Sequence, residues 1–293
     1  MEGRPLCHHN KRTGTMSGNK LVAVVTGANK GVGFGVVRGL CKQFNGDVYL
    51  TARNEELGLK AVEELKKEGL SPKFHVLDLT KPDTIIKLKT FLQETYGGLD
   101  VLVNNAGMAY KVSSKAPFGE QAEVTMQTNF TGTLDVCEAL FPLLRPHARV
   151  ANVSSLVSIS AVKKCSETLR KKLVNPNLSM GELKDLMQKF VDAAKKDAHQ
   201  KEGWPNTAYG VSKIGVTAMS LIQQRELLKD SSRQDIIVNA CCPGYVNTDM
   251  SSHKGPKTID QGADTPVYLA MLPPNTLSPK GNYVSDRKIG KWE

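Results

Sequence analysis

A tyrosine and a lysine four residues apart, Tyr209 and Lys213, are the pair in this sequence best suited to proton transfer. A helix is predicted over Ala208–Leu228, and residues spaced i, i+4 lie on one face of a helix. A free phenol has a pKa of about 10, too high for easy proton exchange at neutral pH, and a nearby cation lowers it. The pair therefore predicts acid–base chemistry, although this spacing alone is a common coincidence.

Three further groups of polar residues lie in or after neighbouring predicted elements. The run Asn104–Gly107 follows one predicted strand, and Ser154 and Ser155 end the next. Asn129 lies in the predicted helix between these two strands. Ligands bind at the carboxyl ends of the strands in open α/β sheets. We therefore expect these residues to meet the tyrosine helix at one edge of a sheet.

A glycine-rich turn near the N-terminus predicts a dinucleotide site. Gly27, Gly31 and Gly33 join a predicted strand to a predicted helix with the spacing Gly-x-x-x-Gly-x-Gly. A pyrophosphate approaches the backbone where side chains are absent, and a helix N-terminus supplies free N–H groups and a partial positive charge. Such a turn can be purely architectural, but its position after the first strand favours the dinucleotide.

The end of the second predicted strand indicates which dinucleotide binds. NAD-binding sites carry an Asp or Glu about 20 residues past the glycines, where it binds the ribose 2′-hydroxyl. Here Ala52 and Arg53 occupy that region, and Lys30 lies inside the glycine turn. Cations pair with a 2′-phosphate, which a carboxylate would repel. Either cation alone could be an ordinary surface charge, but together they predict NADPH as the cofactor.

Short β-rich runs alternate with longer helical patterns, and this alternation predicts the fold that positions these residues. Strands are predicted at Leu21–Thr26, Asp47–Thr51, Lys73–Leu77, Leu99–Val103, Arg149–Val153, Ile236–Ala240 and Asn282–Val284. Helices are predicted at Gly31–Phe44, Glu55–Glu68, Pro82–Thr95 and Glu120–Leu143, among others. Strands joined through helices indicate right-handed crossovers. The predicted fold class is α/β, a Rossmann-type doubly wound parallel sheet of seven strands.

The chain of 293 residues is predicted to form a single domain at 20–293. Residues 1–19 form a basic extension that we expect to be disordered and that lacks the apolar core of a secretory signal. Residues 165–202 break the alternation before Tyr209 and predict a helical insertion. Within it, apolar residues recur at helical spacing, which indicates an amphipathic helix packed on the domain surface: Leu183, Leu186, Met187 and Phe190.

Composition narrows the classes of function. The chain is 40% hydrophobic with six cysteines, too few for a disulfide-stapled scaffold, and its apolar runs are shorter than the roughly 18 residues that span a bilayer. We expect a cytoplasmic protein with reduced thiols and no metal site. The net charge of +10 suits nucleic acid, an anionic membrane or a polyanionic small molecule. No nucleic-acid recognition motif accompanies it, so we assign part of the charge to NADPH and the rest to solvated surface.

The ordered motifs resemble those of the short-chain dehydrogenase/reductase family. They are Thr26–Gly33, Asn104–Gly107, Ser155, Tyr209 with Lys213, and Pro243 with Gly244, and the resemblance runs from Lys20 to about Val284. Three further segments and the insertion resemble the monomeric NADPH-dependent carbonyl reductases: His199–Pro205, Asn239–Gly244 and Gly262–Ala270. The resemblance implies a monomer, because the inserted helices of those reductases cover the face that other members use to form oligomers.

The resemblance also implies roles for four residues. Tyr209 would be the general acid that protonates the carbonyl oxygen, and Lys213 would hold the ribose hydroxyls and lower the pKa of Tyr209. Ser155, rather than Ser154, would bind the carbonyl oxygen by a hydrogen bond. Asn129 would steady Lys213 through a water molecule.

Cofactor and substrate contacts follow from the same resemblance. The cofactor would be held by Gly27, Asn29, Lys30, Gly31, Val32, Gly33, Arg53, Asp78, Leu79, Asn105, Tyr209, Lys213, Pro243, Val246 and Thr248, with Asp78 at the adenine. The substrate would contact Tyr110, Lys111, Val112, Gln121, Ser155, Leu156, Tyr209 and Tyr245. Lys111 could meet a carboxylate of a glutathione conjugate. Tyr245 stands where carbonyl reductases often carry Trp, which leaves the substrate range open.

The expected activity is NADPH-dependent reduction of aldehydes, ketones and quinones, with Tyr209 as general acid. The expected partners are small carbonyl compounds, including glutathione conjugates, and neither nucleic acid nor a membrane. Two alternatives stay open: a steroid or prostaglandin ketone reductase of narrow specificity, and a regulator that senses NADPH without turnover. Loss of Ser155, Tyr209 or Lys213 would favour the regulator, and all three are present.

Overall fold

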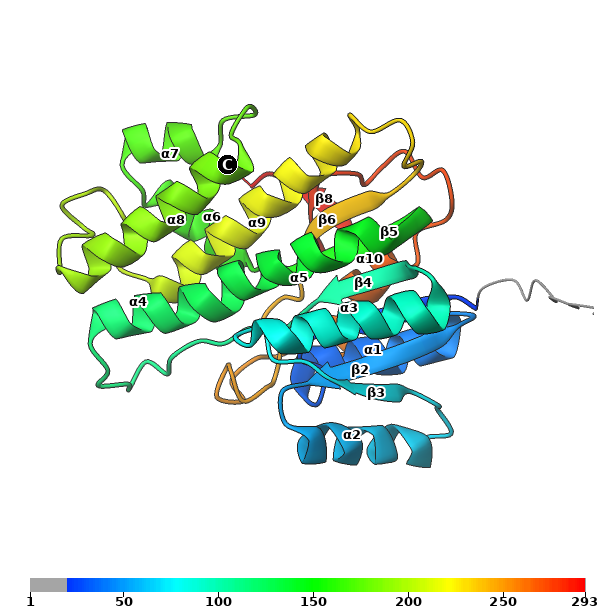
Figure 1. The fold of residues 1–293 in the computed structure, drawn as a ribbon. Helices are drawn as coiled ribbons and strands as arrows, with labels where there is room; N and C mark the ends of the chain where they lie inside the picture. The colour runs from blue at the N-terminus through cyan, green and yellow to red at the C-terminus, as the bar shows by residue number, and fades with distance from the viewer. Residues whose placement is uncertain (1–19, 293) are drawn as a thin grey trace, which may run out of the picture.

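A central sheet carries the residues of interest. The computed structural model describes residues 20–292, so the extension predicted at 1–19 lies outside the described residues. The sheet has the strand order β3-β2-β1-β4-β5-β6-β7-β8 (Figure 1). The strands are β1 (Val22–Val25), β2 (Asp47–Ala52), β3 (Lys73–Val76), β4 (Leu99–Asn104), β5 (Leu144–Val153), β6 (Ile237–Cys242), β7 (Tyr283–Ser285) and β8 (Lys288–Gly290). The first seven are parallel, which confirms the predicted doubly wound sheet.

The sheet of the described residues has eight strands, one more than the seven predicted. β8 pairs with β7 in the antiparallel direction, with Val284 opposite Ile289. The two residues between the strands, Asp286 and Arg287, have φ values of 49° and 59°. A two-residue hairpin turn of type I′ requires positive φ at both positions, and Asn-Gly or Asp-Gly is its usual sequence signal. The two turn residues here are Asp286 and Arg287, so the usual sequence signal is missing and the hairpin was not predicted.

Helices cover both faces of the sheet, which explains why its strands are continuous apolar runs. α1, α2 and α10 pack on one face, and α3, α5 and α9 pack on the other (Figure 1). Their bounds are α1 (Gly31–Gln43), α2 (Glu55–Lys67), α3 (Pro82–Tyr96), α5 (Gly132–Leu140), α9 (Ala208–Leu227) and α10 (Ile259–Ala270). All four residues of β1, for example, are buried.

The helix predicted over Glu120–Leu143 is divided into four pieces. α4 (Phe118–Met126) leads into a π-helical turn, η1 (Gln127–Thr131), which is followed by α5 and a 3₁₀ turn, η2 (Phe141–Leu143). The π turn carries Asn129. π-helical turns inside helices often mark functional sites, because they re-aim one side chain without ending the helix.

The predicted insertion forms helices at one end of the molecule. α6 (Leu156–Lys163) precedes α7 (Glu167–Leu173) and α8 (Met180–Lys195), and the side chain of Ser179 caps α8 (Figure 1). Leu183, Leu186, Met187 and Phe190 of α8 are all buried, and α8 packs against α4 and α9. The amphipathic helix predicted from their spacing is confirmed.

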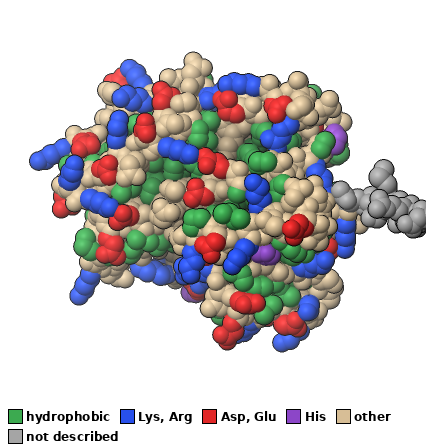
Figure 2. All heavy atoms as spheres, in the orientation of Figure 1, with side chains coloured by type: hydrophobic (Ala, Val, Ile, Leu, Met, Phe, Trp, Pro, Cys, Tyr) green, Lys and Arg blue, Asp and Glu red, His purple; other side chains and the backbone are tan. Residues whose placement is uncertain are grey.

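Charges of both signs are spread over the face drawn in Figure 2, where Lys and Arg alternate with Asp and Glu. Many of these charges form exposed ion pairs, such as Lys184 with Glu138 and Lys195 with Glu123. Within residues 20–292, no helix is both long enough and apolar enough to cross a membrane.

Candidate active site

The glycine turn joins β1 to α1 in a conformation that favours glycine. Gly27 and Gly31 have φ values of 60° and 61°, in the left-handed region. A Cβ atom added to Gly33 would lie 2.4 Å from the Asn105 amide nitrogen, closer than any real contact. α1 begins at Gly31, so its first N–H groups have no partner within the helix. The turn is thus open to the approach of an anion.

The residues after β4 hold this turn in place. The Thr26 hydroxyl accepts hydrogen bonds from the backbone N–H groups of Asn105 and Ala106, both at 3.0 Å. The Asn105 amide donates to the carbonyls of Thr26 and Gly27 at 3.0 and 2.9 Å. Asn105 therefore lies against the glycine turn. This role of Thr26 was not predicted, although its position directly before Gly27 could have indicated it.

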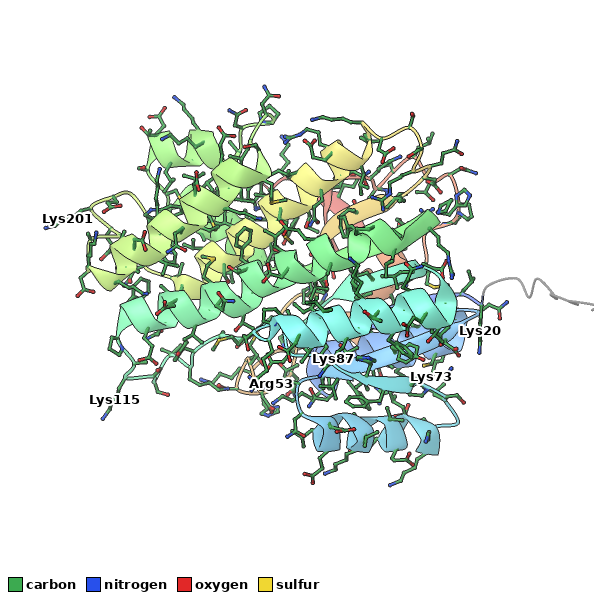
Figure 3. All side chains as sticks on the ribbon, viewed as in Figure 1. Lys20, Arg53, Lys73, Lys87, Lys115 and Lys201 are labelled. Atoms are coloured by element: carbon green, nitrogen blue, oxygen red, sulfur yellow. The ribbon has the colours of Figure 1, made fainter. Side chains whose placement is uncertain are left out.

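Arg53 and Asp78 lie near one another at the carboxyl ends of β2 and β3. Arg53 is exposed and lies near the beginning of α3 (Figure 3). Burial raises the pKa of the Asp78 carboxyl, but hydrogen bonds from Thr80 and the charges of Lys81 and Arg53 outweigh it and hold the pKa below its usual value. Among the described residues, Arg53 has no ion-pair partner within 4 Å, so its charge is available to a 2′-phosphate.

Lys30, the second predicted cation, is already paired. Its ammonium lies 2.7 Å from a carboxylate oxygen of Asp249, in the segment that follows β6. Both side chains are more than half exposed, so the pair contributes little to stability. The Thr248 methyl would lie 3.4 Å from a Cβ on Gly31. The segment around Asp249 therefore lies against the glycine turn, a contact that the sequence analysis missed.

The other predicted cofactor residues surround the same edge of the sheet. Leu79 and Val246 are buried, while Asn29, Val32, Pro243 and Thr248 are partly buried. After β6, Gly244 has a φ of 81°, and its N–H donates to the Cys242 sulfur at 3.2 Å. The same sulfur accepts a hydrogen bond from the Leu156 N–H at 3.2 Å. Cys242 thus connects the turn after β6 to the start of α6.

Tyr209 and Lys213 lie at the N-terminal end of α9, as predicted. The Thr207 side chain caps this helix by accepting a hydrogen bond from the Gly210 N–H at 3.1 Å. The Lys213 ammonium lies 5.7 Å from the centre of the Tyr209 ring and donates to the Val153 carbonyl at 2.7 Å. Lys213 is 4% exposed, and burial lowers its pKa from 10.5 to about 8.

The expected lowering of the Tyr209 pKa is wrong for the protein without cofactor. Burial of the phenol raises its pKa to about 12, and the hydrogen bond with Ser155 offsets only part of this. Lys213 keeps most of its positive charge at neutral pH, but its ammonium lies 5.7 Å from the centre of the Tyr209 ring and the effect of burial on the phenol prevails. The Tyr209 hydroxyl therefore holds its proton at neutral pH, which suits a proton donor.

The two serines at the end of β5 have different surroundings. Ser155 begins α6, and its hydroxyl accepts from the Val157 N–H at 3.2 Å and lies beside Tyr209. The Ser154 hydroxyl is buried, 2.6 Å from the Thr217 hydroxyl and 3.1 Å from the Lys213 carbonyl. Of the two serines, Ser155 is therefore the one whose hydroxyl lies beside Tyr209.

Asn129 holds the loop after β4 against α9. Its amide oxygen accepts from the Met108 N–H at 2.8 Å, and its amide nitrogen lies 2.9 Å from both the Met108 carbonyl and the Ser212 hydroxyl. A Cβ on Gly107 would lie 3.3 Å from the Asn129 oxygen and 3.6 Å from the Lys213 ammonium. Asn129 is therefore close to Lys213, but its direct partners are Met108 and Ser212.

Most of the predicted substrate residues lie in segments that follow β4, β5 and β6, and several of them already form hydrogen bonds within the protein. The Tyr110 hydroxyl donates to Glu120 at 3.2 Å, and the Gln121 amide donates to the Ala116 carbonyl at 2.8 Å. The Lys111 ammonium binds the Asp249 carbonyl and the Ser252 hydroxyl. Three others are exposed, and we call them the apolar rim residues: Val112, Leu156 and Tyr245.

The residues present fit a phosphorylated dinucleotide. The glycine turn leaves backbone room and unpaired N–H groups beside an exposed arginine without an acidic partner. Lys213 makes one hydrogen bond with an ammonium that has three donors, so two are free for a ribose. The carboxylate that would accept a ribose 2′-hydroxyl is absent from the end of β2, where Ala52 stands.

A family comparison agrees with this geometry. The short chain dehydrogenase model matches residues 21–166 and 197–258. The chain belongs to the short-chain dehydrogenase family. The unmatched residues between the two segments contain α7 and α8, so the insertion is an addition to the common family pattern.

Curated relatives match over nearly the whole chain. Carbonyl reductase (NADPH) 1 of Rattus norvegicus is 54% identical over 277 residues, which cover 94% of this chain and 100% of the relative. Its counterpart in Homo sapiens is 53% identical with the same coverage. Carbonyl reductase (NADPH) 3 of Rattus norvegicus is 50% identical, again over 94% of this chain and 100% of the relative.

Solved structures share the fold. Salutaridine reductase from Papaver somniferum superposes with a TM-score of 0.81 at 29% identity, covering 90% of this chain and 99% of that protein. Menthone neomenthol reductase from Mentha piperita has a TM-score of 0.76 at 28% identity, covering 91% of this chain and 98% of that protein. Both support the Rossmann-type architecture.

Proposed function

We propose that this protein reduces the carbonyl group of aldehydes, ketones and quinones with NADPH. The observation that carries the proposal is the placement of the Tyr209 phenol beside the Ser155 hydroxyl and near the Lys213 ammonium, at the edge of the sheet where the glycine turn lies. Relatives named as NADPH-dependent carbonyl reductases, identical at about half of all positions, support the same activity. The glycine turn, Arg53 and Lys213 would hold the cofactor.

The chemistry assigns a different task to each side chain. NADPH supplies the hydride that adds to the carbonyl carbon. Ser155 donates a hydrogen bond to the carbonyl oxygen and stabilises the negative charge that develops there. Tyr209 transfers its phenolic proton to that oxygen, which completes the alcohol, and the tyrosinate then regains a proton from solvent. Lys213 would orient the ribose, and its positive charge would stabilise the transient tyrosinate.

The rim of the site favours a broad range of substrates. Leu156 and Tyr245 are each about half exposed, and Val112 is fully exposed. An open apolar rim receives flat or bulky carbonyl compounds without a tight fit. Glutathione conjugates are included among the proposed substrates, although Lys111 must leave Asp249 and Ser252 to meet a carboxylate.

A substrate panel tests the proposed activity. The purified protein is expected to oxidise NADPH with menadione and with an aromatic ketone, and much more slowly with NADH. Turnover of a steroid or prostaglandin ketone alone would replace the broad activity with the narrow alternative. Binding of NADPH without turnover of any carbonyl compound would contradict the proposal and favour the regulator.

We further propose that residues 20–293 act as one cytoplasmic, monomeric domain. All eight strands of the described residues share one sheet, and α8 lies on α4 and α9. The five cysteines within residues 20–292 are free thiols, as is usual in a reducing compartment. Light scattering of the purified protein is expected to give the mass of one chain, and a dimer mass would contradict the monomer.

A further inference from the structure

A cavity that the catalytic residues do not line is formed by residues of α7, α9 and the C-terminal segment. These elements lie together at one end of the molecule (Figure 1). The volume of the cavity is about 520 Å³, within the range of small-molecule sites. Its wall is formed by the end of α7, the loop to α8, one side of α9 and the segment that includes Trp292. None of the residues assigned to the cofactor or the substrate lines it.

One part of the cavity wall is apolar. Leu173, Leu178 and Ile222 are almost fully buried, so this part of the wall is fixed by the core behind it. Val174 and Leu221 are partly buried and complete the apolar surface. Such a wall suits a hydrocarbon chain, because apolar area leaves water when the chain enters.

The mouth of the cavity is positive. Arg225 and Lys291 line the cavity, and among residues 20–292 no Asp or Glu lines it. The Arg225 guanidinium donates to the carbonyls of Pro176 and Leu178, so it is occupied in holding the wall. Lys291 is exposed and has no ion-pair partner within 4 Å among residues 20–292. An anionic group at the mouth would therefore meet Lys291.

The cavity is separate from the active site, although both use α9. Ala218, which lines the cavity, lies nine residues along the helix from Tyr209, a rise of about 14 Å. Trp292 lines this cavity, and it is not among the residues assigned to the cofactor or the substrate.

We propose that this cavity binds a small amphipathic carboxylate, with its hydrocarbon chain against the apolar wall and its carboxylate at Lys291. The proposal does not depend on the reductase activity. Apolar walls with a single available cation at the mouth select a ligand with one anionic end, and they disfavour a cationic amphiphile of equal length.

The two tryptophans of the chain provide a direct probe. Trp292 lines the cavity, whereas Trp204 is buried in the core of the insertion. Decanoate carrying a terminal bromine atom quenches the fluorescence of an indole that it contacts. With NADP⁺ present to fill the cofactor site, we expect saturable quenching in the wild type that Trp292→Phe removes. Quenching that survives in Trp292→Phe, or no saturable quenching in the wild type, would overturn the proposal.

Calorimetry on matched surface variants gives a second test that does not rely on a tryptophan. Lys291→Glu is expected to weaken decanoate binding at least tenfold, because it places like charge at the mouth. Lys87→Glu changes another exposed lysine, on α3 (Figure 3), and is expected to leave the affinity unchanged. Equal affinities in the two variants, or decylamine binding as tightly as decanoate, would refute the assignment of the carboxylate to Lys291.

Discussion

Replacement of Lys213 by methionine is expected to stabilise the cofactor-free protein at neutral pH while abolishing its activity. Burial lowers the Lys213 pKa from 10.5 to about 8, so keeping this ammonium charged in the folded protein costs about 3 kcal/mol relative to the unfolded chain. Loss of its hydrogen bond to the Val153 carbonyl offsets about 1 kcal/mol. The Lys213→Met variant should therefore be about 2 kcal/mol more stable at pH 7.

The pH dependence of this difference is the sharper test. Between pH 8 and 10.5 the unfolded chain holds the Lys213 proton that the folded protein has released, so raising the pH stabilises the wild type. The advantage of Lys213→Met should shrink by about 3 kcal/mol between pH 7 and 10.5. Urea unfolding of both proteins across this range measures it, with Lys87→Met as the control for loss of a lysine. A difference that is constant with pH would refute the account of Lys213.

Three further substitutions test other parts of the site. Arg53→Ala should weaken NADPH binding about tenfold and leave NADH binding unchanged, whereas equal loss for both would exclude contact with the 2′-phosphate. Gly33→Ala places a Cβ against the Asn105 amide and should abolish NADPH binding in a calorimetric titration; full affinity would contradict the close approach described. Asn129→Ala removes the amide group that forms hydrogen bonds with Met108 and Ser212. The free energy of unfolding should fall by about 2 to 3 kcal/mol, and an unchanged value in urea unfolding would contradict this role.

The sheet and the glycine turn were predictable because each leaves a local pattern. A parallel strand buried on both faces must be apolar throughout, and β1 is an example. Gly27, Gly31 and Gly33 are set by backbone geometry and by the approach of Asn105, so their spacing is visible in the sequence. Tyr209 and Lys213 must lie on the same face of one helix to act together, and a spacing of four residues places them there.

Other features depend on contacts between distant segments and left no such pattern. The π turn at Gln127–Thr131 places Asn129 against Met108 and Ser212, which lie in other elements. The pair of Lys30 with Asp249 joins residues 219 positions apart, and no local spacing predicts it. The Tyr209 pKa was predicted from its lysine neighbour alone, but in the folded protein burial outweighs that charge.

The central claim is that the Tyr209 phenol donates the proton during carbonyl reduction. Tyr209→Phe removes the hydroxyl and keeps the ring, so the packing of α9 is preserved. The decisive measurement compares NADPH binding by fluorescence with turnover of menadione in this variant. We expect NADPH affinity within twofold of the wild type and a loss of turnover of about a thousandfold or more, the usual effect of removing a general acid. Turnover at the wild-type rate would contradict the assignment of Tyr209.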